Sequence, residues 1–297
     1  MNNIYHGIFG YCDDNWVLSP TLSGLQEMMT TIETYCYEHM LKFSTDPKPE
    51  KCKTKCIAFL LKKRCLPDIV LCGNKLPWVS EGVHLGNQFS SCYDGFLRDI
   101  SNKRALFIQK NCELLQEFSF AHPTTKFKTI LIYNSHFTGS PLWDLFSQEA
   151  VRLENAWNIA VRKCFDLPYT AHRYLIEPIS GTCHLKKILI KRFLSFIRQI
   201  ENSPKNVPKM LLNVVKNDTR SITGKNVRMV KLLTDIADID AVKRSDVEKI
   251  EYAACKKDDL WRIKIINEIV EARYGQMEIH DFKVEDLDNI MEYVCTS

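Results

Sequence analysis

Two adjacent aspartates, Asp13 and Asp14, are the residues whose type and spacing first suggest chemistry in this sequence. Neighbouring carboxylates repel each other, and a divalent cation that binds both removes that repulsion. Mg²⁺ prefers oxygen ligands and commonly binds through one or two carboxylates together with substrate phosphates. Aspartate is also a favoured turn residue, so the pair is consistent with a polar turn that binds nothing. The dipeptide alone leaves both interpretations open.

Two short apolar runs flank the aspartates and indicate how they are positioned. Residues 4–9 and 16–18 are rich in β-branched and aromatic side chains, which is typical of two strands joined by a turn. From Ser23, a plausible N-cap, apolar side chains recur at helical spacing through Tyr35. We therefore expect a hairpin with a helix packed on it.

A lysine-rich loop follows the helix. Prolines at positions 47 and 49 exclude regular structure, and Lys51, Lys53 and Lys55 precede an apolar stretch that predicts a strand. These lysines either form a solvated basic loop or contact phosphate. Cys52 and Cys56 lie among them, but without paired C-x-x-C spacing they do not predict a zinc site.

A second hairpin pattern occupies residues 69–79, where a turn is expected at Gly73-Asn74. Residues 83–87, which include Leu85 and Gly86, complete this part of the chain. An ordinary β-hairpin that caps the preceding strands is a sufficient explanation of the pattern.

The chain then changes to helical periodicity with interleaved lysine and arginine. The predicted helices cover residues 93–118, 124–137, 149–165, 185–200 and 247–274. Basic helix faces suit phosphate contacts, and solvated surface is the alternative. Residues 203–208 predict a linker, whereas the acidic segment 278–292 would repel a phosphate backbone and is expected to make packing or partner contacts.

Composition restricts the class of protein. The net charge of +4 is small, so any affinity for nucleic acid must come from local basic clusters. Twelve scattered cysteines in a chain of this length favour reduced thiols inside the cell over a disulfide framework. No apolar stretch is long enough to predict a membrane span, so we expect no membrane partner and a location in the nucleus or cytoplasm.

The segment Tyr11-Cys12-Asp13-Asp14, together with the preceding Phe9-Gly10, resembles the Tyr-x-Asp-Asp box of reverse transcriptases. The next segments of the chain, to about residue 230, resemble in order those downstream of that box in non-LTR retrotransposon polymerases of the jockey-like kind. The resemblance implies an α+β fold. Residues 1–90 would form a partial antiparallel palm sheet with a packed helix, residues 91–202 a helical thumb, and residues 203–297 a C-terminal helical region with an acidic tail.

The resemblance also implies roles for individual residues. Asp13 and Asp14 would be catalytic and hold Mg²⁺ or Mn²⁺, and Lys53 would be a further catalytic residue that addresses the triphosphate. Tyr11, Cys12, Leu85 and Gly86 would lie next to the primer or the nucleotide. An RNA template and a DNA primer would be the partners, besides unidentified element-encoded or host proteins. The residues expected to bind nucleic acid are basic side chains of the helical region, namely Lys103, Arg104, Lys110, Lys126, Lys128, Arg162, Lys163, Lys187 and Lys191.

The expected function is that of a fragment of an RNA-directed DNA polymerase, a nucleotidyltransferase. In the family, the first metal-binding aspartate and the fingers precede the Tyr-x-Asp-Asp box. We therefore expect this chain to be a truncated copy or an incomplete gene model that is inactive by itself. The alternatives are a non-catalytic nucleic-acid-binding remnant and a helical protein-interaction domain.

Overall fold

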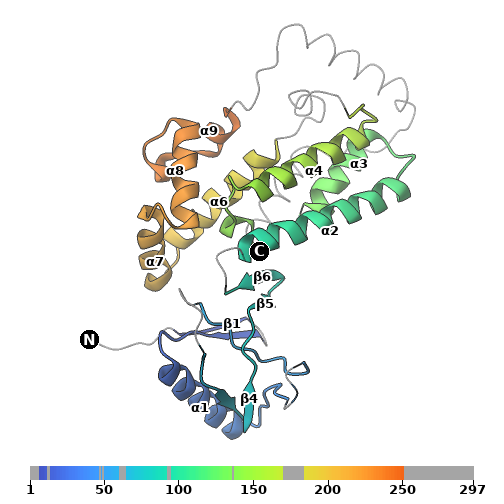
Figure 1. The fold of residues 1–297 in the computed structure, drawn as a ribbon. Helices are drawn as coiled ribbons and strands as arrows, with labels where there is room; N and C mark the ends of the chain where they lie inside the picture. Colours follow the sequence, from blue (N-terminus) through green and yellow to red (C-terminus); the bar gives the residue numbers. More distant parts are fainter. Residues whose placement is uncertain are drawn as a thin grey trace. The chain divides into compact units, whose positions relative to one another are not determined.

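The computed structural model describes residues 7–11, 14–46, 48, 50–59, 65–91, 95–135, 137–169 and 184–250 (Figure 1). The chain is an α+β protein, as predicted, with short antiparallel strand pairs followed by helices. It divides into two compact units, of which the first ends at Asp99 and the second begins at Ile100. The predicted boundary at residue 203 falls inside the second unit.

The first unit opens with a tight hairpin and a helix. Strand β1 (Ile8–Tyr11) pairs with β2 (Asp14–Val17), and α1 spans Leu22–Glu38. The N-cap of α1 is Thr21 rather than the predicted Ser23, because the Thr21 hydroxyl accepts a hydrogen bond from the backbone N–H of Gly24 at 3.1 Å. The helix therefore starts closer to the hairpin than predicted.

Two further hairpins complete the first unit. Strands β3 (Ile69–Leu71) and β4 (Asn74–Leu76) form one pair, and β5 (Glu81–His84) and β6 (Asn87–Ser90) form the other. The β3–β4 turn is Cys72-Gly73, one residue earlier than predicted, and both residues have positive φ. The described strands form three separate pairs and not one continuous palm-like sheet.

The core of the first unit lies between α1 and β3. Met29 of α1 is buried with Ile69, Leu71 and Leu76 of the β3–β4 hairpin, and both Cys52 and Cys56 join this cluster. Gln26 fixes the helix to the strand, because its side-chain amide donates to the Val70 carbonyl at 2.9 Å and accepts from the Val70 N–H at 2.8 Å. The lysine-rich loop is thus anchored through its cysteines.

The second unit is helical. Helix α2 (Gly95–Glu117) begins in the last residues of the first unit and continues into the second. It is followed by α3 (Pro123–Thr129), the π-helical turn η1 (Ile130–Asn134), the 3-10 turn η2 (Ser140–Leu142) and α4 (Gln148–Cys164). The single helix predicted over residues 124–137 is therefore a short α-helix that widens into a π-turn and ends at Asn134.

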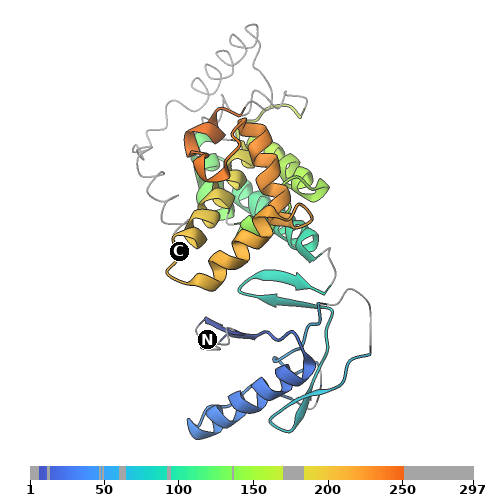
Figure 2. The same ribbon diagram turned by 90° about the vertical axis from the view of Figure 1, so that its left-hand side faces the viewer.

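Helix α6 (Leu185–Glu201) lies at the centre of this unit and contacts α4, α7, α9 and η2. Helices α7 (Asn206–Asn217) and α8 (Ile222–Thr234) pack side by side (Figure 2), and η4 (Ile239–Ala241) and α9 (Arg244–Glu248) follow. The predicted linker at 203–208 is partly helical, since α7 begins at Asn206. Of the helix predicted over residues 247–274, only residues 247–250 are described, and α9 ends within them at Glu248. The rest of that prediction lies outside the described residues.

Large aromatic side chains fill the core of the second unit, and the largest fully buried ones are Phe107, Phe127, Trp143, Trp157 and Phe193. Phe107 stacks on Trp157 with ring centroids 5.8 Å apart, which ties α2 to α4. No helix in the described part of the chain is long and apolar enough to cross a membrane.

Candidate functional site

The β1–β2 hairpin places the two ends of the Tyr-Cys-Asp-Asp segment opposite each other. Tyr11 is the last residue of β1 and Asp14 the first of β2, and these two are paired in the ladder. The connection between them is therefore only two residues long. Those residues, Cys12 and Asp13, lie outside the described part of the chain. Asp14 is exposed at the end of the hairpin, where a carboxylate is accessible to a cation.

Gly10 leaves room for the Asn15 side chain across the hairpin. It is paired with Asn15, and a Cβ added at Gly10 would lie 2.7 Å from the Asn15 side-chain oxygen. A larger residue at position 10 would displace the Asn15 side chain beside Asp14. The Phe9-Gly10 part of the motif thus has a steric reason in this structure.

Trp16 connects this hairpin to the β5–β6 hairpin. Its ring makes edge contacts with His84 and Phe89, with centroids 5.1 and 4.8 Å apart. Alternate residues of a strand share a face, so Asp14 lies on the same face of β2 as Trp16. The face that carries the candidate metal ligand is therefore the one directed toward β5 and β6, where the predicted primer-adjacent residues Leu85 and Gly86 are found.

Leu85 and Gly86 form the two-residue turn between β5 and β6. Their φ angles are 48° and 74°, the left-handed conformation that such hairpin turns require at both positions. Gly86 adopts it freely, but for leucine it costs about 1–2 kcal/mol. The Leu85 side chain is also 44% exposed. The turn therefore keeps an exposed apolar side chain where asparagine or glycine would be more stable.

Lys53 lies on the loop between the two buried cysteines, with its own side chain exposed, as are those of Lys51 and Lys55. The described residues include no hydrogen bond or ion pair between Lys53 and Asp14, so the structure does not bring these two predicted catalytic residues together. The Cys52 thiol donates to the Thr54 carbonyl at 3.0 Å, which fixes the backbone on either side of Lys53.

The buried thiol of Cys56, on the same loop as Lys53, holds its proton more firmly than a free thiol does. Burial, together with the nearby Cys52, raises the pKa of the Cys56 thiol to about 11. Within the described residues, no group of three or more histidine, cysteine, aspartate or glutamate side chains is arranged to hold a metal ion. The oxygen ligands of Asp13 and Asp14 remain the candidates for a hard divalent cation.

The predicted nucleic-acid-binding residues separate into two groups. Lys110 and Lys163 are exposed, and Lys103, Arg104, Lys128 and Arg162 are partly exposed. Lys126 and Lys187, in contrast, are only 4% and 6% exposed. The Lys187 ammonium donates to the Glu248 carbonyl at 3.0 Å, and Lys191 pairs with the Glu248 carboxylate. Lys126, Lys187 and Lys191 therefore lie outside the surface that we assign to nucleic acid.

Other cations of α6 also hold the unit together. Arg192 donates to the Ser135 carbonyl at 3.0 Å, and Arg198 donates to the Val242 carbonyl. The basic amphipathic pattern of this helix thus serves internal contacts, because α6 is central and has neighbours around it.

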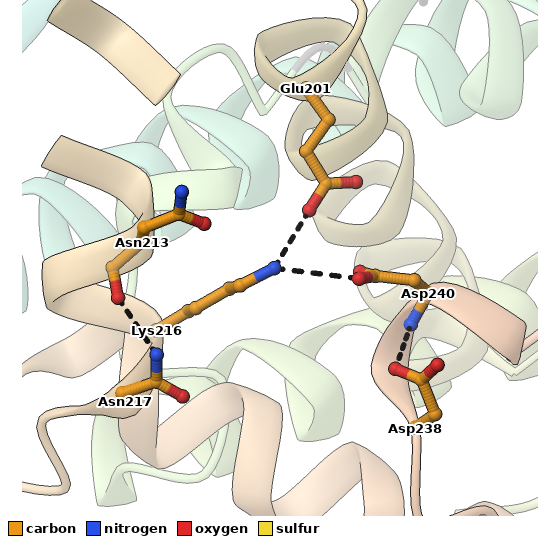
Figure 3. Close-up of polar contacts among 6 residues, drawn as sticks. All are labelled: Glu201, Asn213, Lys216, Asn217, Asp238 and Asp240. Carbon is orange, nitrogen blue, oxygen red and sulfur yellow. Dashed lines mark hydrogen bonds and ion pairs between the residues drawn. The ribbon is translucent and has the colours of Figure 1, made fainter. Parts of the chain in front are cut away.

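Sequence reasoning missed two polar arrangements in the second unit. Lys216 of α7 reaches Glu201 at 3.0 Å and Asp240 at 3.4 Å, which joins three segments (Figure 3). Asn226 is fully buried in α8 and bonds to the backbone of residues 143 and 145. The sequence signal that could have identified Asn226 is that this amide lies next to the buried face of α8, which includes Val227 and Val230.

The arrangement as a whole offers an exposed carboxylate at a hairpin tip, a strained turn beside it and a separate helical unit with cations on its surface. Comparison of the chain with protein-family models, with curated proteins and with solved structures found no match.

Proposed function

We propose that this chain carries the catalytic hairpin and the following helical region of a non-LTR retrotransposon reverse transcriptase, an RNA-directed DNA polymerase. The observation that supports this most is the register of the hairpin, in which Tyr11 is paired with Asp14. That register puts Asp14 at the start of β2, next to a connection of two residues. The same hairpin is packed on β5 and β6 through Trp16, whose ring contacts His84 and Phe89.

In this proposal the aspartates act as ligands. Asp13 and Asp14 hold Mg²⁺ or Mn²⁺, which stabilises the attacking and leaving oxygens of phosphoryl transfer when bound. The backbone at Leu85-Gly86 approaches the primer end, and the exposed Leu85 side chain contacts the terminal sugar or base. Lys53, or a neighbouring lysine of the same loop, meets the triphosphate.

The helical unit would hold the template and primer through phosphates. The cations that remain for this role after the structure is considered are Lys103, Lys110, Lys128 and Arg162, with Arg104 and Lys163 beside them. Such contacts give affinity without sequence preference, and their strength falls as salt displaces them.

The test is a titration of the purified 297-residue chain against a fluorescent RNA–DNA primer-template at two salt concentrations, with and without Mg²⁺. We expect binding that weakens with salt and a further increase in affinity with Mg²⁺. The increase should be lost in Asp13→Asn/Asp14→Asn, whereas the salt-dependent part should remain.

Two results would replace this proposal. Salt-dependent binding whose affinity changes neither with Mg²⁺ nor with the aspartate substitutions would indicate a nucleic-acid-binding remnant. Absence of binding at low salt would indicate that the helical unit serves protein contacts.

A further inference from the structure

A groove runs between α2 and α4 in the helical unit. It has a volume of about 330 Å³ and is lined on α2 from Arg104 to Leu115 and on α4 from Arg152 to Lys163. Each lining segment spans three helical turns, or about 16 Å at 1.5 Å per residue. A groove of this length matches a short helical peptide, which commonly lays one apolar face into such a site.

The floor of the groove is aliphatic. Ile108 and Ile159 are 44% and 51% exposed, and both line the groove. Ala156 and Ala160 on α4 leave room between them, because their side chains end at Cβ. The lining contains no aromatic ring on which a nucleobase could stack, whereas aliphatic side chains of a peptide would find matching surface.

Asn111, one of the polar residues of the lining, is attached to the turn that follows α3. Asn111 is 3% exposed, and its side-chain oxygen accepts from the Asn134 amide at 2.7 Å. Its own Nδ2 is buried and has no hydrogen-bond partner in the described part of the chain. A buried donor without a partner costs about 1–3 kcal/mol, and the Nδ2 atom is too deeply buried to serve as a contact for an occupant of the groove.

The charge of the lining is positive. Arg104, Arg152 and Lys163 line the groove, and no lining residue is acidic. Arg152 already pairs with Glu149, whereas Arg104 and Lys163 form no ion pair with any of the described residues. The Nε of Arg104 is also buried without a partner there. The occupant must therefore bring negative charge together with apolar side chains.

We infer that the groove between α2 and α4 is a docking site for an acidic amphipathic helix of a partner protein. This inference is independent of the polymerase proposal, although nucleic acid and the peptide would compete for Arg104 and Lys163. The apolar face of the helix lies on Ile108 and Ile159. Its carboxylates pair with Arg104 and Lys163.

Cys112 makes the site measurable, since it is exposed and lines the groove. The probe is a synthetic helical peptide of about three to four turns with leucine at i, i+3, i+4 and i+7 spacing and glutamate elsewhere. Alkylation of each cysteine of the full chain by N-ethylmaleimide is followed by mass spectrometry. Saturating peptide should slow the alkylation of Cys112 at least tenfold and leave Cys65 and Cys72, which are exposed in the first unit, unchanged.

Matched variants separate docking from general surface effects. Ile159→Glu should abolish protection of Cys112, whereas Leu106→Glu should not, because Leu106 is equally exposed at 51% but does not line the groove. Arg104→Gln/Lys163→Gln should weaken peptide binding at least tenfold, whereas Lys110→Gln, elsewhere on α2, should leave it unchanged.

Three outcomes would overturn the inference. The peptide could fail to protect Cys112. A peptide with lysine in place of glutamate, or serine in place of leucine, could protect it equally well. A single-stranded RNA of similar length could protect Cys112 where the peptide does not, which would assign the groove to nucleic acid.

Discussion

Asn226 donates a hydrogen bond to the carbonyl of Trp143 at 2.8 Å, although 83 positions separate the two residues in the chain. The same side chain accepts from the Leu145 N–H at 3.1 Å. Asn226 and the Trp143 side chain are both fully buried. One amide therefore satisfies two backbone groups of an irregular segment and attaches that segment to α8.

Asn226→Ala should destabilise the helical unit by about 2–5 kcal/mol, because two buried backbone groups would lose their partners. The measurement is the free energy of unfolding from urea titration followed by circular dichroism. Asn213→Ala on α7 is the matched control, since Asn213 is exposed and its change should stay within about 0.5 kcal/mol. Equal stability of the two variants would contradict the role assigned to Asn226.

Gly224 near the start of α8 should not tolerate a side chain. A Cβ there would lie 2.1 Å from the Asp218 carbonyl oxygen and 3.0 Å from that of Val215, so the backbone between α7 and α8 would have to move. Gly224→Ala should cost roughly 2–4 kcal/mol despite the higher helix propensity of alanine. Thermal unfolding against Thr223→Ala, the neighbouring change without this clash, provides the comparison. A Gly224→Ala protein as stable as the control would show that α7 and α8 can separate without cost.

Lys216 should stabilise the helical unit at neutral pH and lose this effect at alkaline pH (Figure 3). Burial lowers its pKa, but the hydrogen bond to Glu201 and the charge of Asp240 raise it more, so the net pKa lies above the usual value. A raised lysine pKa stabilises the fold below the unfolded-state pKa of about 10.4 and loses this effect as pH rises through the folded-state pKa. The stability difference between the native chain and Lys216→Met should therefore be present at pH 8 and shrink as the pH rises above the unfolded-state pKa of about 10.4.

The size of that difference should be modest, about 0.5–1 kcal/mol, because both ion pairs retain some contact with solvent. Urea titrations of both proteins across this pH range measure it. A difference that stays constant with pH would mean that Lys216 acts through packing alone.

Substitution of Leu85 should change the stability of the first unit and its binding of primer-template in opposite directions. Leu85→Asn should stabilise the first unit by about 0.5–1 kcal/mol, because asparagine adopts a left-handed φ more readily than leucine. If Leu85 contacts the primer end, the same variant should weaken primer-template binding several-fold. Cys72→Asn, in the β3–β4 turn with φ of 51°, is the matched control and should stabilise without weakening binding. Unchanged binding by Leu85→Asn would remove Leu85 from the proposed site.

The helix boundaries were predicted best where the apolar residues recur at helical spacing and a capping residue precedes them. Helix α4 was expected over 149–165 and spans Gln148–Cys164, with Ser147 as a side-chain cap, and α6 matches to one residue. The π-turn after α3 could not be predicted, since nothing local distinguishes Ile130 from a continued α-helix. The turn at Cys72-Gly73 was misplaced by one residue because asparagine is itself a good turn residue.

The sequence predicted the hairpin of the candidate site, but it did not predict which of the basic side chains are exposed. Trp16 lies in the second strand, as the strand pattern predicted, whereas Asp14 was expected in the turn and is the first residue of β2. Lys187 and Lys110 have similar sequence surroundings, yet one is buried against the Glu248 carbonyl and the other is exposed. The difference arises from the position of α6 at the centre of its unit, which is a long-range property. The groove between α2 and α4 likewise depends on two helices that are distant in sequence.

The three strand pairs of the first unit have a further consequence. In the described part of the chain, β1 and β2 pair only with each other, so no other described strand covers the outer edge of either. A separate polypeptide could therefore join this unit by β-augmentation and complement it in trans. Strand edges that no neighbouring strand covers also favour edge-to-edge self-association at high concentration.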